Sequence, residues 1–337
     1  MNKLKKFLIL GFMILFTGCT VSGSRGKESF VKISQKIHPK NSADINFSIH
    51  DDNLKKINSN HLFSKAAGEK IYIDEESNSI YIYHSPLIKY SIGKKPEIIK
   101  DFSVDTMKVK NGKLYYFTNE GFVEENVYRS TFYSEDTNHR ISFNSHVRDF
   151  EILDNGDMLI YQQIYLSEKD IVKSIQRWNK KDGTLTTVDS VKRLGTEYFF
   201  LKSEPFKYKY DDNSTLIKDV LNNRQYTVYI GNEKLLLNDF IITPYEYKGK
   251  EYLALTNLYD NPDNIKKDGL YTYETVGDKF VLSPFIMEDT SQIIAFYNDC
   301  VSFDGKLYDL KTKKIIKEVK EENVFSLLKL NSNYSFL

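Results

Sequence analysis

The residues most able to do chemistry in this sequence are two cysteines, six histidines and many scattered carboxylates. Cys19 and Cys300 lie at opposite ends of the chain, and Cys19 belongs to the modification signal described below, so no internal disulfide is expected. Cys300 lies between apolar and aromatic residues of an expected strand. This context is typical of a buried structural thiol, because a reactive thiol needs an exposed, electropositive setting.

The histidines show no spacing that suits a metal ion, and there is no His-Glu-x-x-His pair. Asp260, Asp263 and Asp268 share one loop, but they lack the alternating oxygen ligands of a calcium loop. No nucleophile elbow, phosphate loop or dinucleotide fingerprint is present. We therefore predict no catalytic residue, no metal and no cofactor, although a carboxylate pair facing across a channel stays open.

The N-terminus carries a short basic segment, Met1–Lys6, followed by ten apolar residues, Phe7–Phe16. Ten residues are too few to span a bilayer but suit a secretory signal. The sequence Leu15-Phe16-Thr17-Gly18-Cys19 resembles the lipobox of bacterial lipoproteins, in which the cysteine is acylated and becomes the first mature residue. Phe16 departs from the usual leucine, and an ordinary signal peptide or a short anchor is the alternative.

The lipobox resemblance divides the chain into a signal peptide at 1–18, a lipidated Cys19 with a flexible tether at 19–29, and one domain at 30–337. The tether is small and polar, and ten extended residues reach about 35 Å. The resemblance implies a protein anchored by lipid to a bacterial cell membrane, on its extracytoplasmic face. The membrane is then the first expected partner.

The rest of the chain favours β-structure, because alanine is rare while Tyr, Phe, Ile and Val abound. The pattern of Val301–Val319 predicts a strand, an Asp-Gly turn, a strand, a polar turn and a strand, and Asp304-Gly305 suits the tight turn of a hairpin. Similar patterns recur at Arg177–Val188 and Gly269–Leu282. Apolar strand pairs precede these hairpins.

Four strands repeating every 40–50 residues or so resemble the blades of a β-propeller. We predict an all-β fold with a single propeller of about seven four-stranded blades, with six or eight as alternatives and a pair of β-sandwiches as the other architecture. Both chain ends would close the ring, through a C-terminal strand pair beside a pair at Ile45–Ile57. The intervening blades are predicted at 60–100, 101–143, 144–188, 189–230, 231–284 and 285–320.

The near-neutral net charge of +1 argues against a nucleic-acid protein, which would carry a basic stripe. We predict a non-catalytic binding or scaffold module for a protein, peptide or glycan. The alternative is a propeller glycoside hydrolase or lyase that acts on extracellular polysaccharide. The long insertions at Val123–Ser145 and Asn257–Lys267 are candidate ligand regions, and Tyr245, Tyr247 and Tyr259 are candidate ligand-binding residues that could stack on sugars or peptides.

The anchor is testable by replacing Cys19 with alanine. We expect this change to release the protein from membranes or to stall its processing, because the acyl chains are the only predicted attachment and each buried CH₂ contributes about 0.8 kcal/mol. Membrane fractionation and the mass of the mature protein are the measurements. Retention of the variant in membranes at the wild-type mature mass would contradict the lipobox assignment.

Overall fold

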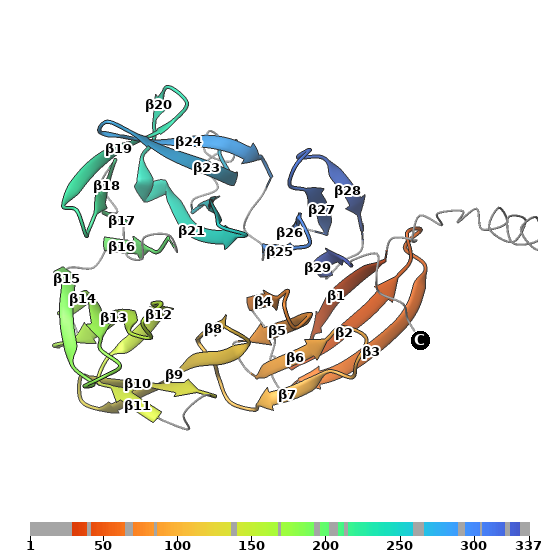
Figure 1. Ribbon diagram of the computed structural model, residues 1–337, viewed down its shortest axis with the longest axis horizontal. Coiled ribbons are helices and arrows are strands. Elements are labelled where there is room, and N and C mark those ends of the chain that lie inside the picture. The colour runs from red at the N-terminus through yellow and green to blue at the C-terminus, as the bar shows by residue number, and fades with distance from the viewer. Residues whose placement is uncertain are drawn as a thin grey trace, which may run out of the picture.

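The structure is a computed structural model, and nearly all of its regular structure is strand (Figure 1). A single turn of 3-10 helix, η2 (Leu237–Asp239), interrupts the strands of the described residues. Among those residues no helix is long and apolar enough to cross a membrane. The described residues are 29–38, 42–64, 70–83, 86–135, 140–167, 170–191, 196–201, 208–211, 215–258, 266–288, 294–303, 305–320 and 324–330.

The strands of the described residues form six sheets, and five of these have four antiparallel strands. Along the chain, each of four sheets is a simple meander, with each strand paired to the next. The first two meanders are β4 (Lys70–Asp74), β5 (Ser79–Tyr83), β6 (Leu87–Ser91) and β7 (Glu97–Lys100), then β8 (Thr106–Lys110), β9 (Lys113–Glu124), β10 (Val127–Ser134) and β11 (Arg140–Phe143). The other two are β12 (His146–Ile152), β13 (Met158–Tyr165), β14 (Ile171–Trp178) and β15 (Leu185–Val191), then β25 (Ala295–Tyr297), β26 (Cys300–Phe303), β27 (Lys306–Asp309) and β28 (Ile315–Glu318).

A larger sheet of nine strands contains two such meanders, joined at their last strands. The joint is a parallel pair, β19 with β24, in the register Thr227↔Lys279 to Ile230↔Leu282. A short strand, β20 (Glu233–Lys234), pairs antiparallel with the end of β19. The two meanders are β16 (Thr196–Phe199), β17 (Tyr208–Asp211), β18 (Leu216–Asp219) and β19 (Arg224–Ile230), then β21 (Phe240–Tyr247), β22 (Lys250–Asn257), β23 (Gly269–Val276) and β24 (Lys279–Ile286).

The sheets stand side by side around a ring, with the first strand of each meander innermost (Figure 1). This is the architecture of a β-propeller, so the predicted all-β propeller class is confirmed. The sheet boundaries also follow the predicted repeat closely. The blade number depends on whether the nine-stranded sheet counts as one blade or two, and it stays a prediction.

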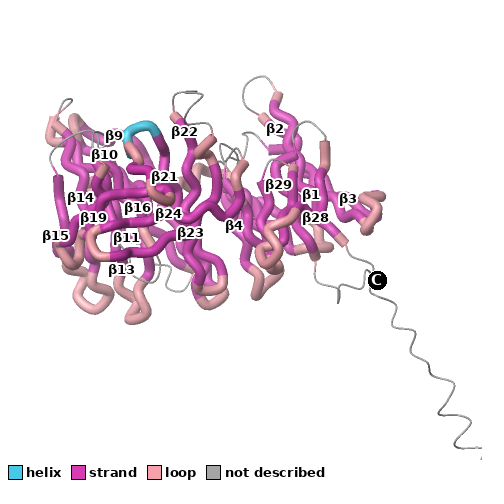
Figure 2. The backbone as a smooth tube through the Cα atoms, turned by 90° about the horizontal axis from the view of Figure 1, so that it is seen from above, coloured by secondary structure: helices cyan, strands magenta, loops and turns pink. Residues whose placement is uncertain are grey.

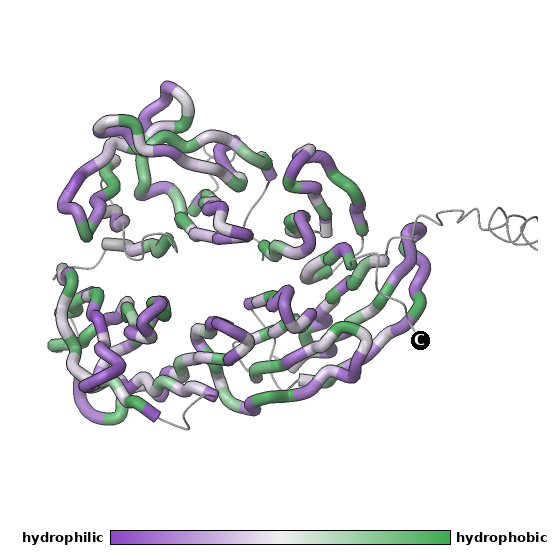
Figure 3. Tube along the Cα trace, viewed as in Figure 1, coloured by the Kyte–Doolittle hydropathy of each residue, from purple (hydrophilic) through white to green (hydrophobic). Residues whose placement is uncertain are grey.

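Seven hydrophobic clusters of the described residues hold the ring together: six join neighbouring sheets, and one joins the two meanders of the nine-stranded sheet. Figure 3 shows the apolar segments of the strands that supply them. Strand β13 shows how the sequence produces this. Its residues Met158 and Ile160 pack toward β8–β11, while Leu159 and Tyr161 pack toward β16–β19. Successive side chains of a strand point to opposite faces, so a strand buried on both faces becomes a continuous apolar run.

The sixth sheet closes the ring with both ends of the chain. Its order is β29 (Val324–Lys329), β1 (Phe30–Ile37), β2 (Ala43–His50) and β3 (Lys56–Ser64). Closure by both ends was predicted, but the composition differs. The N-terminal region supplies three strands, and the described C-terminal residues supply a single strand. The difference arises because Phe30–Ile37 forms a strand that its interspersed polar residues do not reveal.

A five-residue turn recurs between the third and fourth strands of three meanders. Asn179, Asp219 and Asp309 begin these turns, and their side chains accept hydrogen bonds from backbone N–H groups two or three residues further on. The fifth residue has a positive φ in each case: Gly183 at 72°, Asn223 at 52° and Lys313 at 58°. Asx side chains and left-handed positions make such turns compact.

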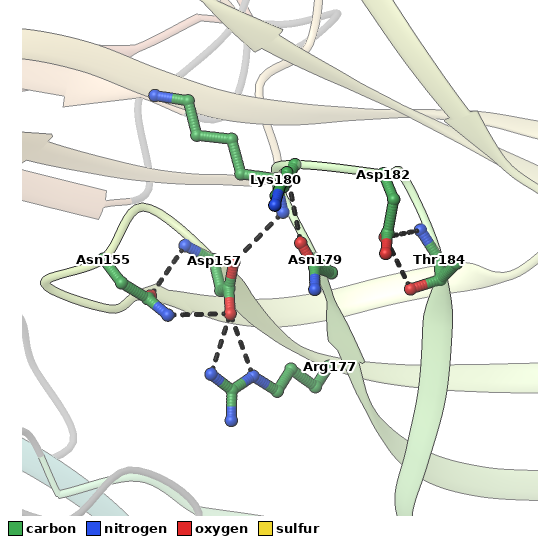
Figure 4. A network of polar contacts seen from close by, with 8 residues as sticks. Asn155, Asp157, Arg177, Asn179, Lys180, Asp182 and Thr184 are labelled. Atoms are coloured by element: carbon green, nitrogen blue, oxygen red, sulfur yellow. Dashed lines mark hydrogen bonds and ion pairs between the residues drawn. The ribbon is translucent and has the colours of Figure 1, made fainter.

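The turn at Asn179 is reinforced by a polar network (Figure 4). Asp157 accepts two hydrogen bonds from Arg177 (2.7 and 3.1 Å) and one from the Lys180 backbone N–H (3.1 Å). These bonds, the Arg177 side chain first, hold the pKa of Asp157 below its usual range. Asp182 accepts from both the hydroxyl and the N–H of Thr184. The network ties two hairpins of one sheet and thus has a structural role.

Gly305 and Gly277 have similar backbone conformations, so comparing them tests how closely the chain packs around Gly305. A Cβ added to Gly305 would lie 2.7 Å from the Val319 carbonyl oxygen, whereas one added to Gly277 would meet open space. Both have positive φ, at 68° and 62°, so alanine strains the backbone equally. We expect Gly305→Ala to lower the free energy of unfolding by about 1–3 kcal/mol more than Gly277→Ala, in denaturant titrations. Equal losses of unfolding free energy in the two variants would contradict the close approach of Gly305 to the Val319 carbonyl oxygen.

Candidate functional site

The chain turns at two opposite ends of the ring, which Figure 2 shows from the side. We call the end at which β8 and β12 begin the upper face. Because neighbouring strands are antiparallel, the β9–β10 turn and the end of β13 lie at this same end. The opposite end, where β8 meets β9 at Asn111-Gly112 and where β1 begins, is the lower face. The segment Val123–Ser145 was predicted to be a long insertion, but it contains β10 and β11, the two outer strands of a regular meander.

Four aromatic side chains gather on the upper face between β8–β11 and β12–β15. We call Phe122, Tyr128, His146 and Tyr165 the aromatic quartet. Tyr128 stacks on His146 with centroids 4.3 Å apart, and Phe122 meets Tyr128 and Tyr165 edge-on at 5.2 and 5.0 Å. Three of the four are half-buried, but Phe122 is 60% exposed. A large aromatic ring that is both held by its neighbours and open to water is suited to contact a ligand.

Irregular strand pairing positions the quartet. The β9–β10 pair shifts register twice, and between the shifts Tyr128 stands directly opposite Phe122. Gly121 precedes Phe122 with φ of 88°. A third shift, between Val147 and Asp149, leaves Arg148 as the extra residue on β12. Bulges re-aim side chains and recur beside functional sites, and three of them surround this cluster.

A directed chain of long hydrogen bonds crosses the quartet. Arg148 Nη1 lies 3.5 Å from His146 Nε2, His146 Nδ1 lies 3.4 Å from the Tyr165 hydroxyl, and that hydroxyl lies 3.4 Å from Gln163 Oε1. A guanidinium only donates, so Nε2 accepts and Nδ1 carries the proton. Burial, helped by the Arg148 charge and opposed by Asp105, lowers the pKa of His146 to about 4. The imidazole is therefore neutral at neutral pH.

A buried polar network forms the floor of the quartet. The Val147 N–H donates to Ser130 Oγ (2.9 Å), and Ser130 Oγ donates to the Ser145 carbonyl oxygen (2.6 Å). Ser145 Oγ in turn hydrogen-bonds Gln162 Oε1. Asn119, opposite Ser130, donates its amide to the Val147 carbonyl oxygen (3.3 Å). The network fixes the start of β12 against β10, and so it holds His146 in place.

The inner strands carry a second polar group near the ring centre. Lys108 on β8 lies 3.3 Å from Asp149 on β12, and Asp149 also accepts hydrogen bonds from Thr106 and from the Phe150 N–H. Burial acts to lower the pKa of Lys108, but the Asp149 and Glu151 carboxylates outweigh it and hold that pKa above its usual range. The Asp149 carboxylate and the Lys108 ammonium group thus neutralise each other's charge.

Tyr245 lies half-buried on inner strand β21, with its ring 5.7 Å from that of Phe296. Burial raises the pKa of Tyr245, and the nearby Tyr83 phenol adds to the shift. The ligand role predicted for Tyr245 stays a prediction.

Tyr247 is buried, and it ties three meanders together at the lower face. Its hydroxyl donates to Glu75 Oε1 (2.6 Å) and accepts from the Asp299 N–H (2.8 Å). Glu75 also accepts from the Asn298 N–H. These contacts give Tyr247 a structural role in the ring. Tyr259 and Cys19 lie outside the described residues, and their predicted roles stay predictions.

Sequence reasoning did not find this site. The segment that it marked from Val123 consists mainly of two regular strands, so its nearness to Phe122 carried no signal. The bulge at Arg148 and the pairing of Tyr128 with Phe122 depend on strand register, which no local pattern revealed. Within the described ranges no group of three His, Cys, Asp or Glu side chains is placed to hold a metal ion.

Fold and site define a β-propeller with an aromatic cluster on its upper face. No family model and no curated protein matches the sequence. Among solved structures, the chain is similar to TolB from Acinetobacter baumannii (TM-score 0.41, 10% identity, 89% of this chain and 82% of that chain) and to a sialidase from Trypanosoma rangeli (0.39, 10%, 89% and 54%). It is also similar to an exo-1,5-alpha-L-arabinanase from a bovine ruminal metagenomic library (0.33, 10%, 64% and 97%). Likenesses this distant say nothing about ligand or reaction.

The low pKa of His146 makes stability depend on pH. Between about pH 6.5 and 4 the unfolded chain binds a proton at His146 that the folded chain does not, so wild-type stability falls as pH falls through this window. We expect His146→Gln to remove this contribution. The measurement is the free energy of unfolding of both proteins at pH 7 and pH 4.5. The wild type should lose more than the variant, and equal losses would contradict a buried neutral imidazole.

Proposed function

We propose that the protein is a non-catalytic binding module, held by lipid on the extracytoplasmic face of a bacterial membrane, and that the aromatic quartet contacts its ligand. The observation that carries this proposal is the exposure of Phe122. Its ring is 60% exposed although Tyr128 and Tyr165 both contact it edge-on. Leaving a large apolar side chain in water has a cost that burial by a ligand would remove.

The position of the chain ends supports the same proposal. Phe30 begins β1 at the lower face, directly after the predicted tether, and β29 ends at that face beside it. A lipid on Cys19 would thus bring the lower face toward the membrane. The upper face, with Phe122, would point away from the membrane, toward soluble proteins, peptides or envelope glycans.

Phe63 offers a matched control for Phe122, since it is a phenylalanine of similar exposure, 56%, on the outer strand β3. The test places a photo-crosslinking phenylalanine analogue at position 122 or 63 of the full chain in its native membrane. We expect a discrete adduct from position 122 and none from position 63. Equal yields, or no adduct from position 122, would contradict a binding surface at the quartet.

The hydrolase alternative is tested with the same full chain and purified envelope polysaccharide. We expect the polymer length to stay constant in size-exclusion chromatography, because binding breaks no bond. Shortening of the polymer by the wild type would instead support the hydrolase or lyase interpretation.

A further inference from the structure

We propose that the ligand of the aromatic quartet is an acidic glycan, recognised by stacking of a sugar ring on Phe122 and by pairing of its carboxylate with Arg148. This inference rests on the proposed binding function and adds the chemical class of the ligand. It is carried by three features of the site: an exposed aromatic ring, a cation aimed by a bulge, and a neutral polar edge between them.

Arg148 supplies the charge. Its side chain is exposed on the innermost strand of its sheet, and the bulge at this position turns it out of the regular alternation. Its guanidinium approaches neutral His146 at 3.5 Å through Nη1, and a guanidinium carries five N–H donors in all. A guanidinium with such donors matches a carboxylate in a bidentate manner.

Because His146 is neutral, Arg148 is the positive charge that this chain of hydrogen bonds offers to a ligand. A protonated imidazole beside Arg148 would add a second positive charge, but the low pKa of His146 keeps it neutral at neutral pH. Arg148 is therefore the one charged group in this chain of hydrogen bonds, and the Asp105 carboxylate lies close enough to influence the pKa values of His146 and Tyr128. A single cation beside an aromatic surface fits a ligand with one carboxylate on each repeating unit.

The edge of the quartet has the chemistry that a sugar ring needs. A sugar ring has one apolar C–H face and a rim of hydroxyl groups, so it needs an aromatic surface bordered by donors and acceptors. Phe122 supplies the aromatic surface, while the Tyr165 hydroxyl and the Gln163 amide hold each other only weakly, at 3.4 Å.

The test measures binding of the full chain in lipid nanodiscs to tetragalacturonate and to its fully methyl-esterified form, by titration calorimetry. The two probes share one sugar chain and differ at the carboxyl group, which is ionised in one and a neutral methyl ester in the other. We expect the acidic probe to bind at least about 10-fold more tightly, because a charged hydrogen bond contributes about 1.5–3 kcal/mol. Its affinity should fall as salt is raised, since an exposed ion pair is screened.

The variants separate the two contacts. Arg148→Gln should remove the preference for the acidic probe and leave the weak binding of the ester unchanged, whereas Arg148→Lys should retain part of the preference. Phe122→Ala should weaken binding of both probes by about 5-fold or more, because it removes the stacking face. Arg224→Gln, at an exposed arginine on β19, is the control and should change neither.

The outcomes also separate this inference from the proposed function. Equal affinity for the two probes, or an Arg148→Gln variant that keeps the preference, would overturn the acidic-glycan assignment. Absence of glycan binding, together with binding of an acidic peptide such as Glu-Phe-Glu that Phe122→Ala abolishes, would overturn the glycan class and retain the binding module. Absence of both glycan and peptide binding, with no crosslink from position 122, would overturn the acidic-glycan inference and the proposed binding function together.

Discussion

Each sheet of this protein has two apolar faces, and it can bury both only by standing between two others. The run Met158–Tyr161 on β13 sends alternate side chains into two different clusters, and β5 does the same with Ile80 and Tyr81. A row of such sheets always leaves two unburied faces at its ends. Closing the row into a ring removes them. The pairing of β29 with β1 is therefore the step on which the burial of these two end faces depends.

Much of the fold was predictable because it follows from local chemistry. Asp-Gly turns, strand-length apolar runs and the regular spacing of turns all act over a few residues, and they identified the repeat correctly. The strand Phe30–Ile37 was missed because its alternation is short: Val31 and Ile33 alternate with Lys32 and Ser34, but Gln35 stands where the next apolar residue would be. Its strand form comes from pairing with β2 and β29, and β29 comes from the opposite end of the chain.

The candidate site was less predictable, because long-range register creates it. Tyr128 faces Phe122 only because β9 carries extra residues, and Arg148 points outward only because β12 is bulged. Tyr247 illustrates the same limit. Its hydroxyl hydrogen-bonds Glu75 and the Asp299 N–H, which are 172 and 52 positions away, so no local pattern indicated these contacts. In both cases long-range pairing chose the partners.

The parallel pairing of β19 with β24 has a consequence for how the ring comes apart. The other neighbouring meanders meet through side-chain packing, which can separate one sheet at a time. Thr227–Ile230 and Lys279–Leu282 instead share a backbone ladder, so the residues from β16 to β24 form one cooperative unit. Amide protons in this ladder should exchange together and late. The ring would then open first at another junction. The strands from β16 to β24 would move as one rigid unit.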